Sequence, residues 1–224
     1  SEKVVLVAID DRTLHRLGRW PIARHWYAEL LNRLGNPAAV GLNVILADPS
    51  PEDETLAEAL EMHPRVVLPV YLDRQRGWVM PSEPLGSGPL GHIHLEPGVD
   101  GVVRQVFHAV THRGRRIPSL ASAILSTAGE AAAQADSAPP AQENALEIIQ
   151  SDPMWINYYG GRDAVRTLSF LDVLDGKWSP SFFDGRIVLV GITAVGLEEG
   201  VLTPLSGERK RLSSVEAHAQ ILSN

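Results

Sequence analysis

The sequence predicts an α/β fold: a mixed, mainly parallel sheet with helices on both faces and one inserted antiparallel hairpin. The first observation is a set of continuous apolar runs, which are typical of strands buried on both faces of a parallel sheet. These runs are residues 4–9, 40–47, 66–72 and 187–192. Segments with helical spacing separate them, which predicts right-handed βαβ units. Alternating apolar and polar residues at 92–96 and 102–110 predict the hairpin.

Helix signals follow each of the first two strands. Asp10 or Asp11 is expected to cap a short helix that Gly18 ends. A second helix is predicted by an apolar stripe at i, i+3, i+4 and i+7. Its members are Tyr27, Leu30, Leu31 and Leu34. Ser50 as N-cap and Pro51 at the first helical position predict a third helix after the second strand.

The second half of the chain continues the alternation. Residues 74–89 are rich in Gly, Pro and Ser and predict a surface loop. Ser119 begins another helix, and residues 155–159 are expected to form a strand. A capping box between Ser213 and Glu216 predicts the last helix.

Residues 1–224 are predicted to form a single domain, because no second core or internal repeat is visible. Residues 128–144 consist mainly of Ala, Gln, Glu, Ser and Pro, and are expected to be a low-complexity excursion outside the core.

Composition excludes several classes of protein. The chain has 20 Lys and Arg against 27 Asp and Glu, a formal net charge of −7. The longest basic run is Arg209 to Arg211, so nucleic acid is not an expected partner. The absence of Cys excludes disulfides, thiol nucleophiles and Cys-based zinc sites.

The sequence shows no signal peptide and no membrane-spanning segment, since the apolar run at 4–9 is far too short. The chain starts without Met and stops inside a predicted helix at Asn224. We therefore expect an excised domain of a longer protein.

Cofactor motifs are weak. Residues 86–91, Gly-Ser-Gly-Pro-Leu-Gly, satisfy the dinucleotide fingerprint literally, but a strand follows them and Pro89 lies inside. A turn is the better interpretation. Neither a Gly-x-Ser-x-Gly elbow nor a phosphate-binding loop occurs, so no cofactor is predicted.

Four histidines are candidate ligands for a metal ion. His92 and His94 share one face of a predicted strand, and His108 and His112 on the next strand could face them across the hairpin. No carboxylate stands at a recognised ligand spacing beside them, so the sequence predicts no metal.

Polar residues follow the predicted parallel strands. Asp10, Asp11, Asn43 and Thr193 fall at carboxyl ends, where open α/β sheets bind ligands, and we expect any small ligand there. A soluble hydrolase using Asp10 and Asp11 with a divalent cation is the alternative function. A pure dimerisation module is a third possibility.

Ordered blocks of the sequence resemble the second type of CHASE domain, a family of sensory domains on the outer face of bacterial membrane receptors attached to cyclases and histidine kinases. The similarity runs from about Lys3 to Asn224. The blocks include VVLVAIDDRTLHRLGRWPIARHWYAELLNRLG, AVGLNVILADPSPEDETLAEAL, LGHIHLEPGVDGVVRQV and GRIVLVGITAVGL.

The resemblance carries over to particular positions. The family's Ile-Asp-Asp is residues 9–11, and the following residues match its two other motifs: Trp20, Pro21, Arg24, Asp100, Gly101, Val102, Val103 and Arg104. We expect these residues to position the structure, with both arginines pairing with Asp carboxylates and Gly101 permitting a turn. The sequence departs from the family at Asn43, where an acid is usual, and at Glu198 and Glu199, which replace Gly-Asp.

The resemblance implies an extracytoplasmic sensor, not an enzyme, that controls a cytoplasmic cyclase or kinase. Its partners would be an unknown small ligand or stimulus, a membrane reached through flanking helices outside this sequence and, in the full receptor, a second copy. Signal transfer is expected through the last helix, where Val215, Ala219 and Leu222 should pack on the sheet.

Overall fold

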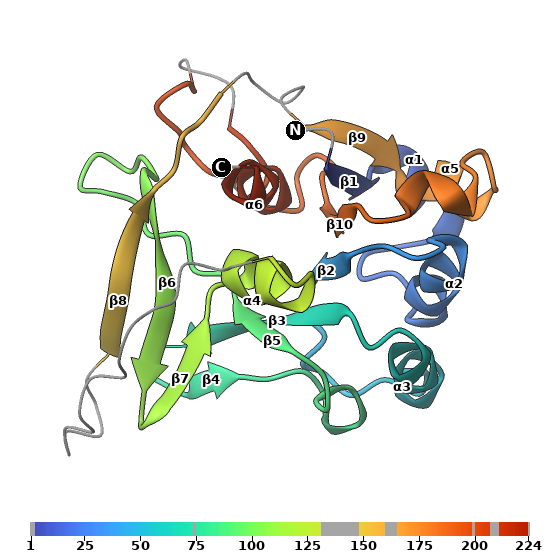
Figure 1. Ribbon diagram of the computed structural model, residues 1–224, viewed down its shortest axis with the longest axis horizontal. Helices are drawn as coiled ribbons and strands as arrows, with labels where there is room; N and C mark the ends of the chain where they lie inside the picture. Colours follow the sequence, from blue (N-terminus) through green and yellow to red (C-terminus); the bar gives the residue numbers. More distant parts are fainter. Residues whose placement is uncertain are drawn as a thin grey trace.

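The computed structural model describes residues 3–73, 75–130, 148–159, 165–198, 200–206 and 211–223. Within these residues the main sheet has seven strands, in the order β4-β3-β2-β10-β1-β9, with β5 also pairing with β3. Their bounds are β1 Val4–Ile9, β2 Ala39–Asn43, β3 Val66–Asp73, β4 Gly77–Val79, β5 Leu90–His92, β9 Arg166–Ser169 and β10 Ile187–Ile192. All pairings in this sheet are parallel except that of β3 with β4, which confirms the mixed, mainly parallel fold (Figure 1).

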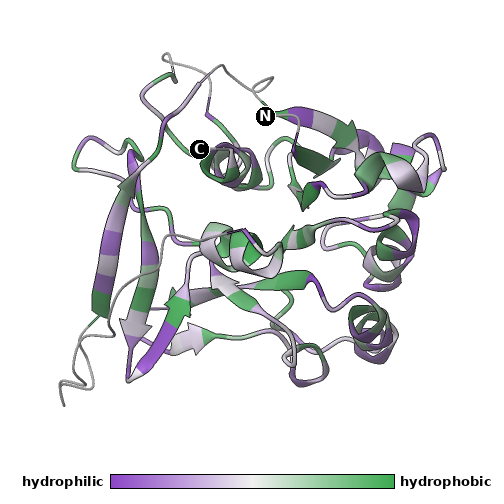
Figure 2. Ribbon diagram, viewed as in Figure 1, coloured by the Kyte–Doolittle hydropathy of each residue, from purple (hydrophilic) through white to green (hydrophobic). Residues whose placement is uncertain are grey.

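Helices cover both faces of the main sheet, as predicted. One face packs against α1 (Asp11–Leu17), α2 (His25–Arg33), α3 (Asp53–Met62) and α5 (Phe170–Leu174). The other packs against α4 (Leu120–Thr127) and α6 (Ser214–Leu222). The strands β1, β2 and β10 are buried along their whole length, which is why their sequences are continuous apolar runs (Figure 2).

A separate antiparallel sheet packs beside α4 and α6 in the order β7-β6-β8. Its strands are β6 (Gln105–His112), β7 (Arg115–Pro118) and β8 (Ile148–Trp155). The inserted hairpin is β6 and β7, which turn at Arg113 and Gly114, both with positive φ.

The predicted pairing of 92–96 with 102–110 is wrong. Strand β5 contains only His92 of residues 92–96 and instead pairs in parallel with β3. A single bridge, Pro97 to Val103, lies just beyond the end of the predicted first strand. Alternation in the sequence fixes neither the extent of a strand nor its partner strand. The Arg-Gly turn also lacks the Asn or Asp that usually marks a tight hairpin.

Three local expectations also need correction. Residues 156–159, expected to form a strand with Trp155, are not in a strand, because β8 ends at Trp155. The loop expected at 74–89 contains β4 and a short 3-10 helix, η1 (Glu83–Leu85), with Leu85 buried. The N-cap residue of α3 is Glu52 rather than Ser50. The expected excursion at 128–144 lies outside the described residues from position 131 onward.

Helix starts were predicted more reliably, because capping depends on local sequence. Asp10 caps α1, Ser119 caps α4, and Ser213 with Glu216 forms the capping box of α6. These caps fix where the helices begin relative to the strand ends.

Candidate functional site

The carboxyl ends of β1, β2 and β10 lie together at one edge of the main sheet, which we name the carboxyl edge. These strands are parallel neighbours, with Ile9 opposite Ile192 and Asn43 opposite Gly191. The sheet therefore brings Asp10, Asp11, Asn43 and Thr193 to the same edge. All four residues predicted to share an edge do so in the structure.

The two aspartates at this edge hold the local structure. Oδ1 of Asp10 accepts hydrogen bonds from the backbone N of Thr13 at 2.8 Å and from its hydroxyl at 2.7 Å. Oδ1 of Asp11 accepts one from the backbone N of Val195 at 3.3 Å. Asp11 thus joins α1 to the loop that follows β10. Among the residues described, no group of three or more His, Asp or Glu side chains is arranged to hold a metal ion.

A chain of polar contacts connects the carboxyl edge to α6. Nδ2 of Asn43 donates to the hydroxyl of Ser214 at 3.3 Å, and the backbone N of Ser214 donates to Oε1 of Glu198 at 2.7 Å. The Glu198 carboxylate consequently lies at the positive end of the α6 dipole. Burial raises the pKa of Glu198, and the nearby Glu216 adds to that effect, while the bond from Ser214 opposes it.

The sequence marked Glu198 as a departure from the family but did not reveal its contact with α6. Glu198 and Ser214 are 16 positions apart in the sequence, and nothing in the intervening composition indicates that they meet. The available signal was a carboxylate between the last strand and a helix that begins with a capping box, since helix N-termini attract carboxylates.

Helix α6 packs directly on the backbone of β10. A Cβ atom placed on Gly191 would lie 2.7 Å from Cβ of Val215, so only glycine leaves room for this contact. Val215, Ala219 and Leu222 are all buried in the core between α6, α4 and the sheets. The helix is therefore attached at its start by polar contacts and along its length by packing.

Arg24 is at the centre of a buried network near the start of α2. Its guanidinium contacts the Asp53 carboxylate and the backbone carbonyl of Asp48, and donates to the hydroxyl of Ser82 at 3.0 Å. The Arg24 and Asp53 side chains are 9% and 6% exposed. The preceding Trp20–Pro21 peptide bond is cis. This network fixes the loops that leave β2 and enter α3.

Asp100 and Arg104 form a two-bond ion pair at 2.9 and 2.7 Å. The pair closes the exposed turn that contains Gly101, whose φ of 78° is in the left-handed region. Hydrogen bonds from Arg104 and from the backbone of Val102 lower the pKa of Asp100 to about 2.

The four histidines that the sequence offers as candidate metal ligands do not form one patch. The rings of His92 and His94 lie 5.6 Å apart, whereas Nδ1 of His108 is 3.1 Å from the hydroxyl of Ser122 on α4. His112 is buried beside Gly77 instead. The sequence did not associate a further histidine, His218 of α6, with this region.

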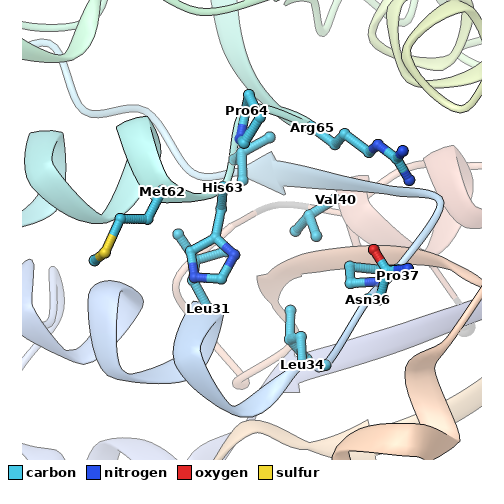
Figure 3. A pocket seen from close by; sticks show the side chains of 11 residues that line it. Leu31, Leu34, Asn36, Pro37, Val40, Met62, His63, Pro64 and Arg65 are labelled. Carbon is cyan, nitrogen blue, oxygen red and sulfur yellow. The ribbon is translucent and has the colours of Figure 1, made fainter.

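Two cavities lie at the opposite edge, where the parallel strands begin, which we name the amino edge. One, of about 340 Å³, is between α2, α3 and the first residues of β2 and β3. Figure 3 shows the His63 ring beside the apolar side chains of Leu31 and Val40 there, and burial lowers the pKa of His63. The other, of about 310 Å³, is bordered by both Lys3 and Ser223.

The protein is an α/β domain in which hydrogen bonds join the carboxyl edge of the main sheet to the start of α6. The family model of the CHASE2 domain matches residues 1–224, and the chain belongs to this family. CHASE2 domains are extracellular sensory domains of signalling receptors. No curated protein and no solved structure matches the chain. No helix among the described residues is long and apolar enough to span a membrane.

Proposed function

We propose that this domain senses a stimulus on the outer side of a bacterial membrane receptor and controls a cytoplasmic cyclase or kinase. In this proposal, helices outside the sequence anchor it to the membrane, and two copies pair in the full receptor because such output enzymes generally act as dimers. A small ligand would bind at the carboxyl edge near Asp10, Asp11, Asn43 and Thr193.

The observation that carries the proposal is the contact chain from Asn43 through Ser214 to Glu198. It connects the edge where parallel sheets bind ligands to the start of α6. A change at the strand ends would therefore move α6 as a rigid body, the type of bistable change that packed elements allow.

The first test replaces Gly191 with Ala in the full receptor. The new methyl group would meet Val215 at 2.7 Å and displace α6 from β10. We expect the basal cyclase or kinase output to shift at least about twofold, with a stability loss of about 1–3 kcal/mol.

The matched control is Gly88→Ala, because the nearest atom to a Cβ there is 3.7 Å away and its φ is ordinary. This variant should keep the unmodified output. Equal output from both variants and the unmodified receptor, with the proteins folded and inserted, would reject transfer through α6.

A second test replaces Leu222 with Asp. Leu222 is 7% exposed and packs in the core near the end of α6. A carboxylate there loses apolar burial and must reach water, so the end of the helix should detach. We expect the receptor to lose its response to any condition that changes the output of the unmodified protein. Circular dichroism of the domain checks that the fold remains, and a normal response would contradict the prediction.

A further inference from the structure

Three imidazoles meet where β5 and the residues after it pack near α6. His92 and His218 are each 1% exposed, and the ring centroids of His92 and His94 are 5.6 Å apart. Nε2 of His94 accepts a hydrogen bond from the backbone N of Leu72 at 2.7 Å, so this ring carries its proton on Nδ1. We name His92, His94 and His218 the histidine cluster.

No carboxylate among the described residues acts on His92 or His218. Neither ring nitrogen of His92 or His218 makes a hydrogen bond of normal geometry with another described residue. The charged or titratable groups that act on His92 are His94 and His218, and none from β3, β4, α4 or β7 contributes. Glu96 raises the pKa of His94. Besides burial and the mutual repulsion with His92, the backbone of Ile93 acts on His218. Protonation would therefore place like charges together inside the core.

Burial is the main cause of the perturbed titration. It lowers the pKa of His92 to about 3 and of His218 to about 4, and the backbones of Phe107 and Ile93 oppose this only weakly. Burial also lowers the pKa of His94. His92 and His218 are consequently neutral near neutral pH while α6 is packed, and the hydrogen bond that Nε2 of His94 accepts requires the neutral form of that ring.

We infer that protons are a stimulus of this domain, and that acid releases α6 from its packed position on β1 and β10 by protonating the histidine cluster. This inference rests on the proposed function, because α6 is the proposed route to the output. In a released form the rings would be hydrated and would have their ordinary pKa of about 6.5. Because the pKa of each ring is higher in the released form than in the packed form, acid favours release, even though the packed rings titrate far below neutral pH.

The size of the effect follows from this difference. For a ring with a pKa of about 3 when packed, and about 6.5 when released, lowering the pH from about 7 to about 5 raises the released-to-packed ratio about 25-fold. Two such rings multiply their effects. Glu198 acts in the opposite direction, because its pKa is raised in the packed form and acid then favours packing.

The test is hydrogen exchange of the 224-residue chain between about pH 7 and about pH 5, corrected for intrinsic exchange rates. We expect the amides of α6 to lose protection on the order of tenfold or more, while those of α2 and α3 retain theirs. Unchanged protection in α6, or equal loss throughout the chain, would overturn the inference.

Variants identify the groups responsible. His218→Leu and His92→Phe should each weaken the pH dependence of α6, and His15→Leu, at an exposed position of α1, should leave it intact. If His218→Leu does not fold, His92→Phe alone decides, and an unaltered pH dependence in it rejects the cluster. Failure here with altered output in Gly191→Ala would remove protons as a stimulus but leave the proposed function standing.

Discussion

Gly35→Ala is expected to destabilise the domain by about 3–5 kcal/mol. Gly35 has φ of 61°, and a Cβ atom there would lie 2.5 Å from the backbone O of Pro180. The substitution therefore adds left-handed backbone strain of about 1–2 kcal/mol to a clash with backbone that cannot rotate away. Pro180 belongs to η3 (Pro180–Phe183), which precedes β10 in the chain. The clash would therefore disturb β10 and its pairing with β1. Urea unfolding measures the change.

Gly185→Ala provides the control for backbone strain alone. Its φ of 67° is nearly the same, but nothing lies within 4 Å of the added carbon. We expect a loss of about 1 kcal/mol. Equal losses at the two glycines would show that the contact with Pro180 does not contribute.

Arg24→Met is expected to cost about 3–5 kcal/mol, because it leaves the Asp53 carboxylate buried without its cation. The hydroxyl of Ser82 and the carbonyl of Asp48 lose a donor in the same step. Chemical denaturation of the variant measures this loss.

Two further variants separate the buried charge from the loss of a side chain. Arg33→Met removes an exposed i,i+4 pair with Glu29 and should cost at most about 0.5 kcal/mol. Adding Asp53→Asn to Arg24→Met should recover part of the stability, because the uncompensated charge is removed. No recovery in the double variant would indicate that packing, and not charge, dominates at Arg24.

The parts of the fold that depend on local pattern were predictable. The run Val4 to Ile9 is buried at every position, and such a run has few alternatives to a central strand. The cap of α6 depends on residues three apart, Ser213 and Glu216. In both cases the predictive signal lies within a few neighbouring residues of the sequence.

Features that depend on distant partners were not predictable. Residues 92–96 alternate in the sequence, but β5 ends at His92 and its partner strand is β3, not β6. The partner of Arg24 is 29 positions away, and nothing in the spacing selects Asp53. His218 stands among Ala217 and Ala219 on an apolar helix, and a buried histidine there is visible only once the helix is placed.

Helix α6 runs from the carboxyl edge of the main sheet to its amino edge, so a tilt at its start would move its end. Its first turn is held on β10 at Gly191, while its last residues border the same cavity as Lys3 at the amino edge. Leu222 lies roughly 10 Å along the helix from Val215, at about 1.5 Å per residue. A tilt of about 10° around the contact with Gly191 would thus move the end of α6 by about 2 Å relative to β1. A small displacement at the carboxyl edge would then become a change in the separation of residues 3 and 223.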